Sequence, residues 1–370
     1  MEKKNQIPKY PHLRFPEFTD EWKEVTLGEV LSFETGYPFS SDAFNEEGNG
    51  VRLIKNRDLK ADDRVVFYGG EYDAQYIVQN GDILIGMDGD FSPCLWKKGK
   101  ALLNQRVGRV NVNRNTSRVF ILYVLIDSLK KVELKTSSTT VKHLSHKDVE
   151  KIKASLPSFP EQRKIAALLS LIDERIEVQN AIYKEQEVAK TLLSKELLIP
   201  ENDWTEYAVR DCLTYEQPAK YLVKYTDYSS DSTLTPVLTA NKGFILGYTS
   251  EQGIYQKGAC IIFDDFTLDC KYVPFAFKVK SSAIKILQAR KGFDIRFMFE
   301  VIKSLSLSPF AHKRHYISEV EPIKVLVPSF AKQEKIARLF AALDERLAVE
   351  RAYAEQLKQQ KTYLLRQMFI

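Results

Sequence analysis

The fold is decided by a segment that occurs twice in the chain. Leu156-Pro-Ser-Phe-Pro-Glu-Gln-Arg-Lys-Ile165 returns as Val327-Pro-Ser-Phe-Ala-Lys-Gln-Glu-Lys-Ile336, an offset of 171 residues (327 − 156). The two copies continue in register without a gap, and Asp-Glu-Arg recurs at the same offset, from Asp173 and from Asp344. A weaker repeat opens each half, where Trp22-Lys-Glu-Val-Thr-Leu matches Trp204-Thr-Glu-Tyr-Ala-Val. Self-similarity of this kind indicates a repeated structural unit. The unit here is a globular lobe followed by a helical segment.

The helical segments carry apolar residues at alternating steps of four and three, the seam of a long coiled coil. About 38 residues at ~1.5 Å each make a rod of roughly 57 Å. Equal length and matching stripes favour the two helices pairing with each other, antiparallel. The alternative is that each helix packs separately on its own lobe. The seam residues are Ile165, Leu169, Ile172, Ile176, Leu193 and Leu197 in the first helix, and Ile336, Phe340, Leu343, Leu347, Leu357 and Leu364 in the second.

Each lobe has the pattern of a mixed α/β fold. Alternating apolar stretches bounded by Gly, Asn and Asp predict strands, and short apolar-periodic pieces predict helices. The strands are expected at 82–86, 107–111 and 259–263, and the helices near 121–129 and 296–305. The predicted fold is therefore two globular α/β lobes related by a pseudo-twofold repeat and separated by two long antiparallel helices.

The net charge of +5 hides a division within each lobe. Residues 15–93 carry 6 Lys/Arg against 17 Asp/Glu, whereas residues 94–143 carry 11 against 2. The second lobe repeats the division, with 5 against 11 over residues 199–270 and 10 against 2 over residues 271–315. A basic face on an otherwise acidic lobe favours binding of a polyanion such as DNA. The alternative is that the charges mix and cancel on the folded surface.

The basic halves also contain side chains suited to DNA. Amides and guanidinium groups pair with base edges, and small polar loops flanked by cations contact phosphates. The first-lobe candidates for DNA binding are Asn104, Gln105, Arg106, Lys135, Ser137, Ser138, Thr139, Lys142 and His143. The second-lobe candidates are Asn241, Lys242, Lys278, Lys280, Ser281, Ser282, Lys313, Arg314 and His315.

Catalytic and metal-binding motifs are missing from the sequence. It has no Asn-Pro-Pro or Asp-Pro-Pro methyltransferase signature and no glycine-rich nucleotide-binding loop. Asp264, Asp265 and Asp269 crowd near Lys271, which suggests a turn between strands rather than a nuclease centre. The four scattered cysteines and the two His-x-x-His pairs do not make a zinc site. We therefore expect no catalytic residue, no metal and no bound cofactor.

The sequence also lacks an apolar run long enough for a membrane span and a recognisable secretory signal. We expect a cytoplasmic protein that has no membrane partner.

These residues resemble the specificity subunits of type I restriction–modification systems. The resemblance rests on Leu13-Arg-Phe-Pro-Glu-Phe18, Gly81-Asp-Ile-Leu84, Leu103-Asn-Gln-Arg106 and the repeated Pro-Ser-Phe segments, and it covers essentially the whole chain. Two departures are that the second lobe lacks a clear Leu-Asn-Gln-Arg equivalent and that Ala331-Lys332 replaces Pro-Glu. The implied layout is a first target-recognition domain at 1–159, a central helical spacer at 160–198, a second target-recognition domain at 199–329 and a C-terminal helical spacer at 330–370.

The resemblance implies that each lobe binds one half of a bipartite double-stranded DNA target. Two modification methyltransferase subunits would methylate adenine N6, and two restriction/translocase subunits would translocate and cleave DNA. S-adenosylmethionine, ATP and Mg²⁺ would then belong to those partners, and this chain would be non-catalytic. The principal alternative is a bivalent sequence-specific DNA-binding regulator without enzymatic partners; a self-contained restriction enzyme and a coiled-coil adaptor fit the sequence less well.

Overall fold

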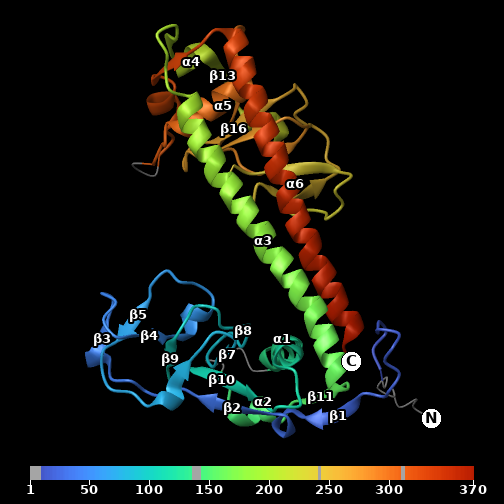
Figure 1. The fold of residues 1–370 in the computed structure, drawn as a ribbon. Helices are drawn as coiled ribbons and strands as arrows, with labels where there is room; N and C mark the ends of the chain where they lie inside the picture. Colours follow the sequence, from blue (N-terminus) through green and yellow to red (C-terminus); the bar gives the residue numbers. More distant parts are fainter. Residues whose placement is uncertain (1–9, 136–142, 241–242, 310–312) are drawn as a thin grey trace, which may run out of the picture. The chain divides into compact units, whose positions relative to one another are not determined.

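The computed structural model describes residues 10–135, 143–240, 243–309 and 313–370. The chain divides into two compact units, one formed by Met1–Gln179 with Ala354–Ile370 and the other by Asn180–Tyr353 (Figure 1). We call residues 22–156 the first lobe and residues 204–327 the second lobe. Within the described ranges, no helix has the length and apolarity needed to cross a membrane.

Each lobe contains a four-stranded antiparallel sheet, and the strand order corresponds between the two lobes. Both faces of each sheet are buried along its central strands: Ile83 and Leu84 point to different cores of the first lobe, and Ile261 and Ile262 to different cores of the second. The first sheet has the order β2 (Leu31–Thr35), β10 (Val107–Val112), β7 (Ile83–Gly86), β8 (Pro93–Leu95). The second has the order β13 (Leu213–Glu216), β19 (Ile284–Ala289), β16 (Cys260–Asp264), β17 (Cys270–Val273). The strands expected near 82–86, 107–111 and 259–263 are thus β7, β10 and β16.

A second sheet completes each lobe, and a two-stranded ribbon closes it. The parallel pair of β4 (Val51–Ile54) and β9 (Ala101–Leu103) in the first lobe corresponds to that of β14 (Thr235–Leu238) and β18 (Lys278–Val279) in the second. The first sheet is β3 (Phe44–Asn45), β5 (Val66–Tyr68), β4 (Val51–Ile54), β9 (Ala101–Leu103), β6 (Ile77–Val78), and the second is β15 (Ile245–Thr249), β14 (Thr235–Leu238), β18 (Lys278–Val279). The ribbons are β1 (Lys23–Thr26) with β11 (Lys153–Leu156), and β12 (Thr205–Ala208) with β20 (Lys324–Val327).

The principal lobe helix, α1 (Arg118–Lys135) or α5 (Ile295–Ser304), packs against the four-stranded sheet. These are the helices expected near 121–129 and 296–305. Trp22 and Trp204, which open the repeats, are buried in the corresponding cores. The short helices are α2 (His146–Glu150), α4 (Val209–Cys212), η1 (Leu27–Glu29), η2 (Ser41–Ala43), η3 (Asn56–Leu59), η4 (Ala74–Tyr76), η5 (Pro218–Tyr221) and the π-type η6 (Tyr316–Val320).

The two long helices are α3 (Phe159–Leu197) and α6 (Phe330–Met368), each of 39 residues. In the first unit the beginning of α3 lies against the end of α6, where Lys361 Nζ is 2.5 Å from Asp173 Oδ1. In the second unit Lys190 of α3 pairs with Asp344 of α6. Both contacts require antiparallel helices. The expected mixed α/β fold, with two repeated lobes and two antiparallel helices, is confirmed.

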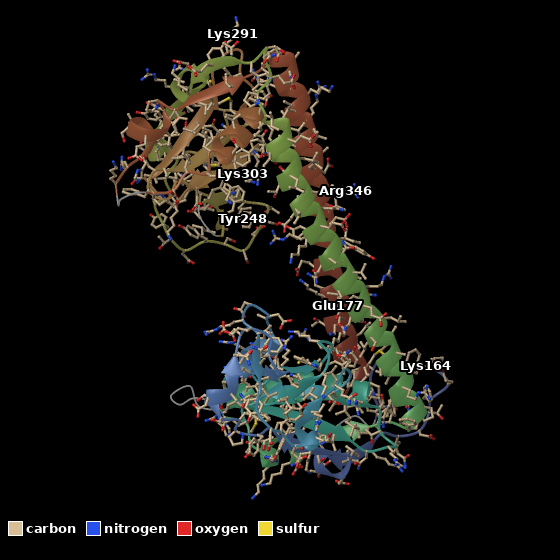
Figure 2. The ribbon with its side chains drawn as sticks, turned by 60° about the vertical axis from the view of Figure 1, so that its left-hand side comes forward. Lys164, Glu177, Tyr248, Lys291, Lys303 and Arg346 are labelled. Atoms are coloured by element: carbon tan, nitrogen blue, oxygen red, sulfur yellow. The ribbon has the colours of Figure 1, made fainter. Side chains whose placement is uncertain are left out.

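The seam residues contribute to both the helix pair and the lobe cores. Ile165 and Leu169 belong to the first core, and Ile336 and Phe340 belong to the second. The helices therefore pack on their lobes as well as on each other. Ile172 and Leu357 are also buried, whereas Ile176, Leu193, Leu197, Leu343, Leu347 and Leu364 are half-buried. Lys164 and Arg346 are exposed on these helices (Figure 2), and so are apolar residues such as Leu171 and Val349.

A buried glutamine ties each long helix to its lobe. Gln162 Oε1 accepts the Ser117 amide at 2.9 Å, and Gln162 Nε2 donates to the Pro157 carbonyl at 3.0 Å. Gln333, one repeat later, accepts the Asp294 amide at 2.8 Å and donates to the Pro328 carbonyl at 3.0 Å. The same residue of the repeat thus joins the start of the long helix to the start of α1 or α5.

The departure at Ala331-Lys332 has a structural counterpart. Buried Glu161 accepts Arg14 Nε at 2.7 Å and Trp22 Nε1 at 3.3 Å, and the bond to Glu161 raises the pKa of Arg14. At the matching position Lys332 Nζ lies 2.6 Å from Glu201. The second copy therefore also has an ion pair at this junction, but here the long helix supplies the cation instead of the carboxylate.

Candidate nucleic-acid interface

The candidate turn of the first lobe, Asn104 to Arg106, connects β9 with β10. The Tyr37 amide donates to the Leu103 carbonyl at 2.9 Å, and the Gln105 amide donates to the Tyr37 carbonyl at 3.1 Å. Half-buried Asn104 uses its side-chain oxygen to accept the Gln105 amide at 2.9 Å. Asn104 therefore shapes the turn, whereas the side chains of Gln105 and Arg106 are exposed.

Asp88 joins Arg106 to His143. The imidazole Nδ1 of His143 lies 2.8 Å from Asp88 Oδ1, and Arg106 NH1 lies 3.4 Å from the same carboxylate. The backbones support this arrangement, because the Met87 amide donates to the Arg106 carbonyl and the Leu144 amide donates to the Met87 carbonyl. Two candidate residues far apart in the sequence are thus brought to one surface by an aspartate that was not a candidate.

The corresponding turn of the second lobe is Ser281 to Ala283. Val107 pairs with Gly86 in the first lobe, and Ile284 pairs with Asp264 in the second. The Asp265 amide donates to the Ala283 carbonyl, as that of Met87 does to Arg106. Ser281 and Ser282 therefore occupy the positions of Asn104 and Gln105, and Ala283 that of Arg106. The second lobe has a turn in the same place with uncharged side chains.

The other second-lobe candidates divide into exposed and buried residues. Lys280, Lys313 and Arg314 are exposed. Lys313 Nζ lies 2.7 Å from Glu319. The hydrogen bond from Lys313, and to a lesser extent that from His315, lowers the pKa of the Glu319 carboxyl group. Lys313 is therefore engaged on the surface, whereas Lys280 and Arg314 have exposed side chains suited to an external anion.

The prediction that Lys278 and His315 lie at the DNA-binding surface is wrong, because the structure buries both side chains. Lys278 is 2 % exposed, and its ammonium donates to the Gln252 carbonyl at 2.7 Å. His315 is fully buried, and its backbone amide donates to the Asp265 carbonyl at 3.0 Å. Both side chains lie inside the second lobe, so in this structure they hold the fold together and do not face a ligand.

Several candidates fall outside the described residues. They are Ser137, Ser138, Thr139, Lys142, Asn241 and Lys242, together with the side chain of Lys135.

Lysines and arginines of the basic segment form ion pairs with carboxylates of the acidic segment in each folded lobe. In the first lobe, cations of the basic half pair with carboxylates of the acidic half, as Arg109 does with Glu34 at 2.8 Å and Lys98 with Asp62 at 2.9 Å. Buried Lys285 lies 3.5 Å from buried Asp265 in the second lobe. Part of the division along the sequence is therefore cancelled in space, and the exposed residues of the two turns are better candidates than the basic segments as a whole.

The acidic cluster of the second lobe is structural. Asp264 Oδ1 accepts the amides of Phe266 and Thr267, each at 3.0 Å, and shapes the turn between β16 and β17. Asp265 accepts the Tyr316 amide at 2.8 Å. Across the described ranges, we find no group of His, Cys, Asp and Glu side chains arranged to hold a metal ion. Burial raises the pKa of the Cys94 thiol to about 11, which disfavours a reactive thiolate there.

Sequence analysis missed Tyr37 and Asp88. Tyr37 is an exposed aromatic residue whose backbone brackets the Asn104–Arg106 turn, and its ring packs on those of Phe39 and Tyr76. Both residues lie in the acidic half of the first lobe, outside its basic segment. The only sequence signal was Met87-Asp-Gly-Asp90 directly after a predicted strand, a pattern typical of a loop at a sheet edge.

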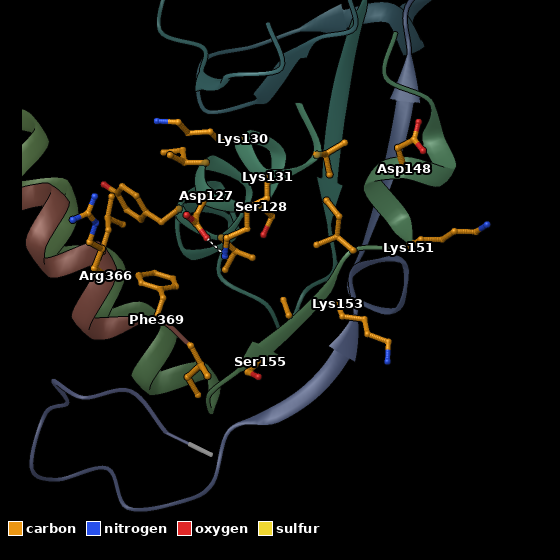
Figure 3. Close-up of a pocket in the computed structure, with 18 of the residues that line it drawn as sticks. Asp127, Ser128, Lys130, Lys131, Asp148, Lys151, Lys153, Ser155, Arg366 and Phe369 are labelled. Atoms are coloured by element: carbon orange, nitrogen blue, oxygen red, sulfur yellow. Dashed lines mark ion pairs between the residues drawn. The ribbon is translucent and has the colours of Figure 1, made fainter. Parts of the chain in front are cut away.

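A groove of about 810 Å³ lies elsewhere in the first unit, between α1, β11 and the end of α6 (Figure 3). Apolar side chains such as Phe369 and Ile152 line it together with several lysines. Lys151 and Lys153 extend away from its centre (Figure 3), and Lys131 pairs with Asp127 at 2.5 Å. None of the described candidate residues lines this groove.

Comparison with known protein families gives one matching domain. Residues 19–187 match the family described as "Type I restriction modification DNA specificity domain".

Two curated relatives from Escherichia coli carry matching names. The chain is 31 % identical to the type I restriction enzyme EcoBI specificity subunit over 231 residues, which are 55 % of this chain and 48 % of the relative. It is 44 % identical to the EcoR124I/EcoR124II specificity subunit over 154 residues, 37 % of this chain and 38 % of the relative. These matches therefore span half or less of the relatives' length.

A solved structure shares the fold over nearly the whole chain. It is the crystal structure of a type I restriction–modification system S subunit from M. genitalium, with a TM-score of 0.68 at 16 % identity, covering 98 % of this chain and 99 % of that one.

Proposed function

We propose that this chain, whose residues 19–187 match the type I restriction modification DNA specificity domain, is the DNA-recognition subunit of a type I restriction–modification complex. Each lobe binds one half of a bipartite double-stranded DNA target. The chain itself is non-catalytic; it directs adenine-N6 methylation and restriction by partner subunits. In this proposal two modification methyltransferases and two restriction/translocase subunits assemble with the chain, and S-adenosylmethionine, ATP and Mg²⁺ bind to those partners.

The observation that carries the proposal is the pair of equivalent turns. Both turns connect to the second strand of a sheet whose order is the same in each lobe, yet one reads Asn-Gln-Arg and the other Ser-Ser-Ala. Two lobes that recognise different DNA sequences need the same backbone scaffold with different exposed side chains at the equivalent turn. Base-edge contacts specify sequence, whereas phosphate contacts position the protein.

The proposal does not require base chemistry in this chain. An enzyme that modifies a base extrudes it into a pocket with catalytic groups. The two turns are held by backbone hydrogen bonds and carry mostly polar side chains, which suits contact with DNA rather than chemistry on a base. Recognition and chemistry are thus assigned to different subunits.

The test is to express this chain with a modification methyltransferase subunit of the same system and to map N6-methyladenine across the host genome at single-base resolution. We expect a gapped two-part motif, methylated on both strands, that disappears when this chain is omitted. Methylation that does not change when this chain is removed, with an active methyltransferase present, would contradict the proposal. The bivalent regulator would then be the better account.

A further inference from the structure

We propose that Asp88 is a positioning residue, which holds Arg106 and His143 side by side for contact with one half of the DNA target. The inference rests on the proposed function and names a residue outside the basic segments. Its basis is the juxtaposition of three side chains from separate parts of the chain, in which one carboxylate lies 2.8 Å from His143 Nδ1 and 3.4 Å from Arg106 NH1.

The loop that carries Asp88 is held from both sides. Asn56 Nδ2 donates to the Asp88 carbonyl at 2.7 Å. This approach depends on Gly86, because a Cβ there would lie 1.8 Å from the Asn56 side-chain oxygen. Gly89 follows with a φ of +80°, which disfavours side chains other than glycine. Asn56 on one side, and the backbone contacts to the Arg106 and His143 segments on the other, therefore place the Asp88 carboxylate beside both side chains.

A neighbouring carboxylate completes the loop without joining the cluster. Asp90 pairs with Lys60 and accepts the Ser92 amide at 2.8 Å. The hydrogen bond from Lys60, and after it the one from Ser92, lowers the pKa of Asp90 to about 2. Asp90 thus lies two residues from Asp88 on the same loop, but its carboxylate contacts Lys60 and Ser92 rather than Arg106 and His143. It is a matched control for the loss of a carboxylate here.

An acidic residue at a DNA-binding surface has a cost in affinity, because it repels phosphates. Asp88 is about one quarter exposed, whereas the Arg106 and His143 side chains are each half exposed or more. The carboxylate thus lies behind the Arg106 and His143 side chains and directs them outward. A guanidinium held at one edge keeps its other N–H groups for a base or a phosphate.

This geometry predicts opposite changes in two measured quantities. Asp88→Ala frees Arg106 and His143, so discrimination against single-base changes in one half-site should fall by about 5- to 100-fold, the range of a lost base contact. The same change removes a negative charge, so affinity for random-sequence duplex should rise about two- to fivefold. A merely structural role would lower both quantities together.

The experiment uses the full chain with its methyltransferase partner, and fluorescence-anisotropy competition with duplexes carrying single-base changes in each half-site. The half-site that responds to Arg106→Ala defines where Asp88 acts. We expect Asp88→Ala and Arg106→Ala to be non-additive there, because each removes the same oriented contact. Asp88→Asn, which keeps an acceptor oxygen, should retain part of the discrimination. Asp90→Ala should leave it unchanged.

The inference is overturned if Asp88→Ala leaves discrimination intact, if its effect adds fully to that of Arg106→Ala, or if Arg106→Ala alters no half-site. It is also overturned if Asp90→Ala has the same effect as Asp88→Ala, since that would indicate a general collapse of the loop. Failure of the proposed function has a different signature: the unaltered chain would then direct no two-part methylation motif at all.

Discussion

Arg106 presents its guanidinium on a turn whose neighbours are held by backbone hydrogen bonds. An arginine in such a place can pair with a guanine edge in the major groove, a contact worth about 1–3 kcal/mol of discrimination. We expect Arg106→Ala to relax recognition in one half-site only, as measured by competition with singly substituted duplexes. An equal loss of affinity on all DNA sequences would identify a phosphate contact instead.

Lys278 and Lys280 are near neighbours with different environments. The buried ammonium of Lys278 donates to the carbonyls of Gln252 and Gly253, whereas Lys280 is exposed. Lys278→Ala should lower the free energy of unfolding by about 1–3 kcal/mol, because it removes the hydrogen bonds of a buried ammonium and its ion pair with Glu251. Lys280→Ala should change it by less than about 0.5 kcal/mol. Urea denaturation of the two variants checks this; similar stability losses would contradict the assignment of Lys278 to the core.

At the scale of the elements, the repeat places reciprocal ion pairs along the two long helices. Asp173 and Lys361 pair in the first unit, and their repeat equivalents Asp344 and Lys190 pair in the second. These residues are identical between the copies because each aspartate faces the lysine of the other helix. Each aspartate also contacts its lobe helix, since Asp173 accepts the Tyr123 hydroxyl at 2.8 Å and Asp344 pairs with Arg296.

We expect the Asp173–Lys361 pair to contribute a coupling energy of about 0.5–1 kcal/mol, a value reduced by partial exposure to solvent. A double-mutant cycle with Asp173→Asn and Lys361→Met measures it by denaturation, and the amide keeps an acceptor for Tyr123. The control combines Asp173→Asn with Lys190→Met on the same helix, which should be additive. Equal coupling in both cycles would mean that the pair does not define the antiparallel register.

Local periodicity explains which parts of this fold could be predicted. The seam from Ile165 to Leu197 and the strand at 82–86 have periods that a sequence displays directly. The equivalence of Gln105 with Ser282 depends on strand register between distant segments, so it had no local signal. The contact of Asp88 with His143 spans 55 residues, and nothing near Lys278 distinguishes it from an exposed lysine. Those parts of the candidate site required the three-dimensional structure.

For the whole molecule, the continuity of α3 and α6 through both units has a functional consequence under the proposed role. Each helix begins in one unit and ends in the other, because the division falls after Gln179 in α3 and after Tyr353 in α6. The Asp173–Lys361 and Lys190–Asp344 pairs bracket these points. A change of length there must therefore be made in both helices to keep both ion pairs.

We expect insertion of four helix-forming residues after Gln179, together with four after Tyr353, to lengthen the unread spacer of the target. Four residues add about one turn and ~6 Å, which corresponds to about two base pairs at ~3.4 Å each. Mapping of N6-methyladenine should return the same bases in both half-sites with this longer gap. Four residues inserted beside Gly48, in an exposed loop of the first lobe, should leave the gap unchanged. An unaltered gap in the helix variant, with methylation still active, would show that the two helices do not set the spacing.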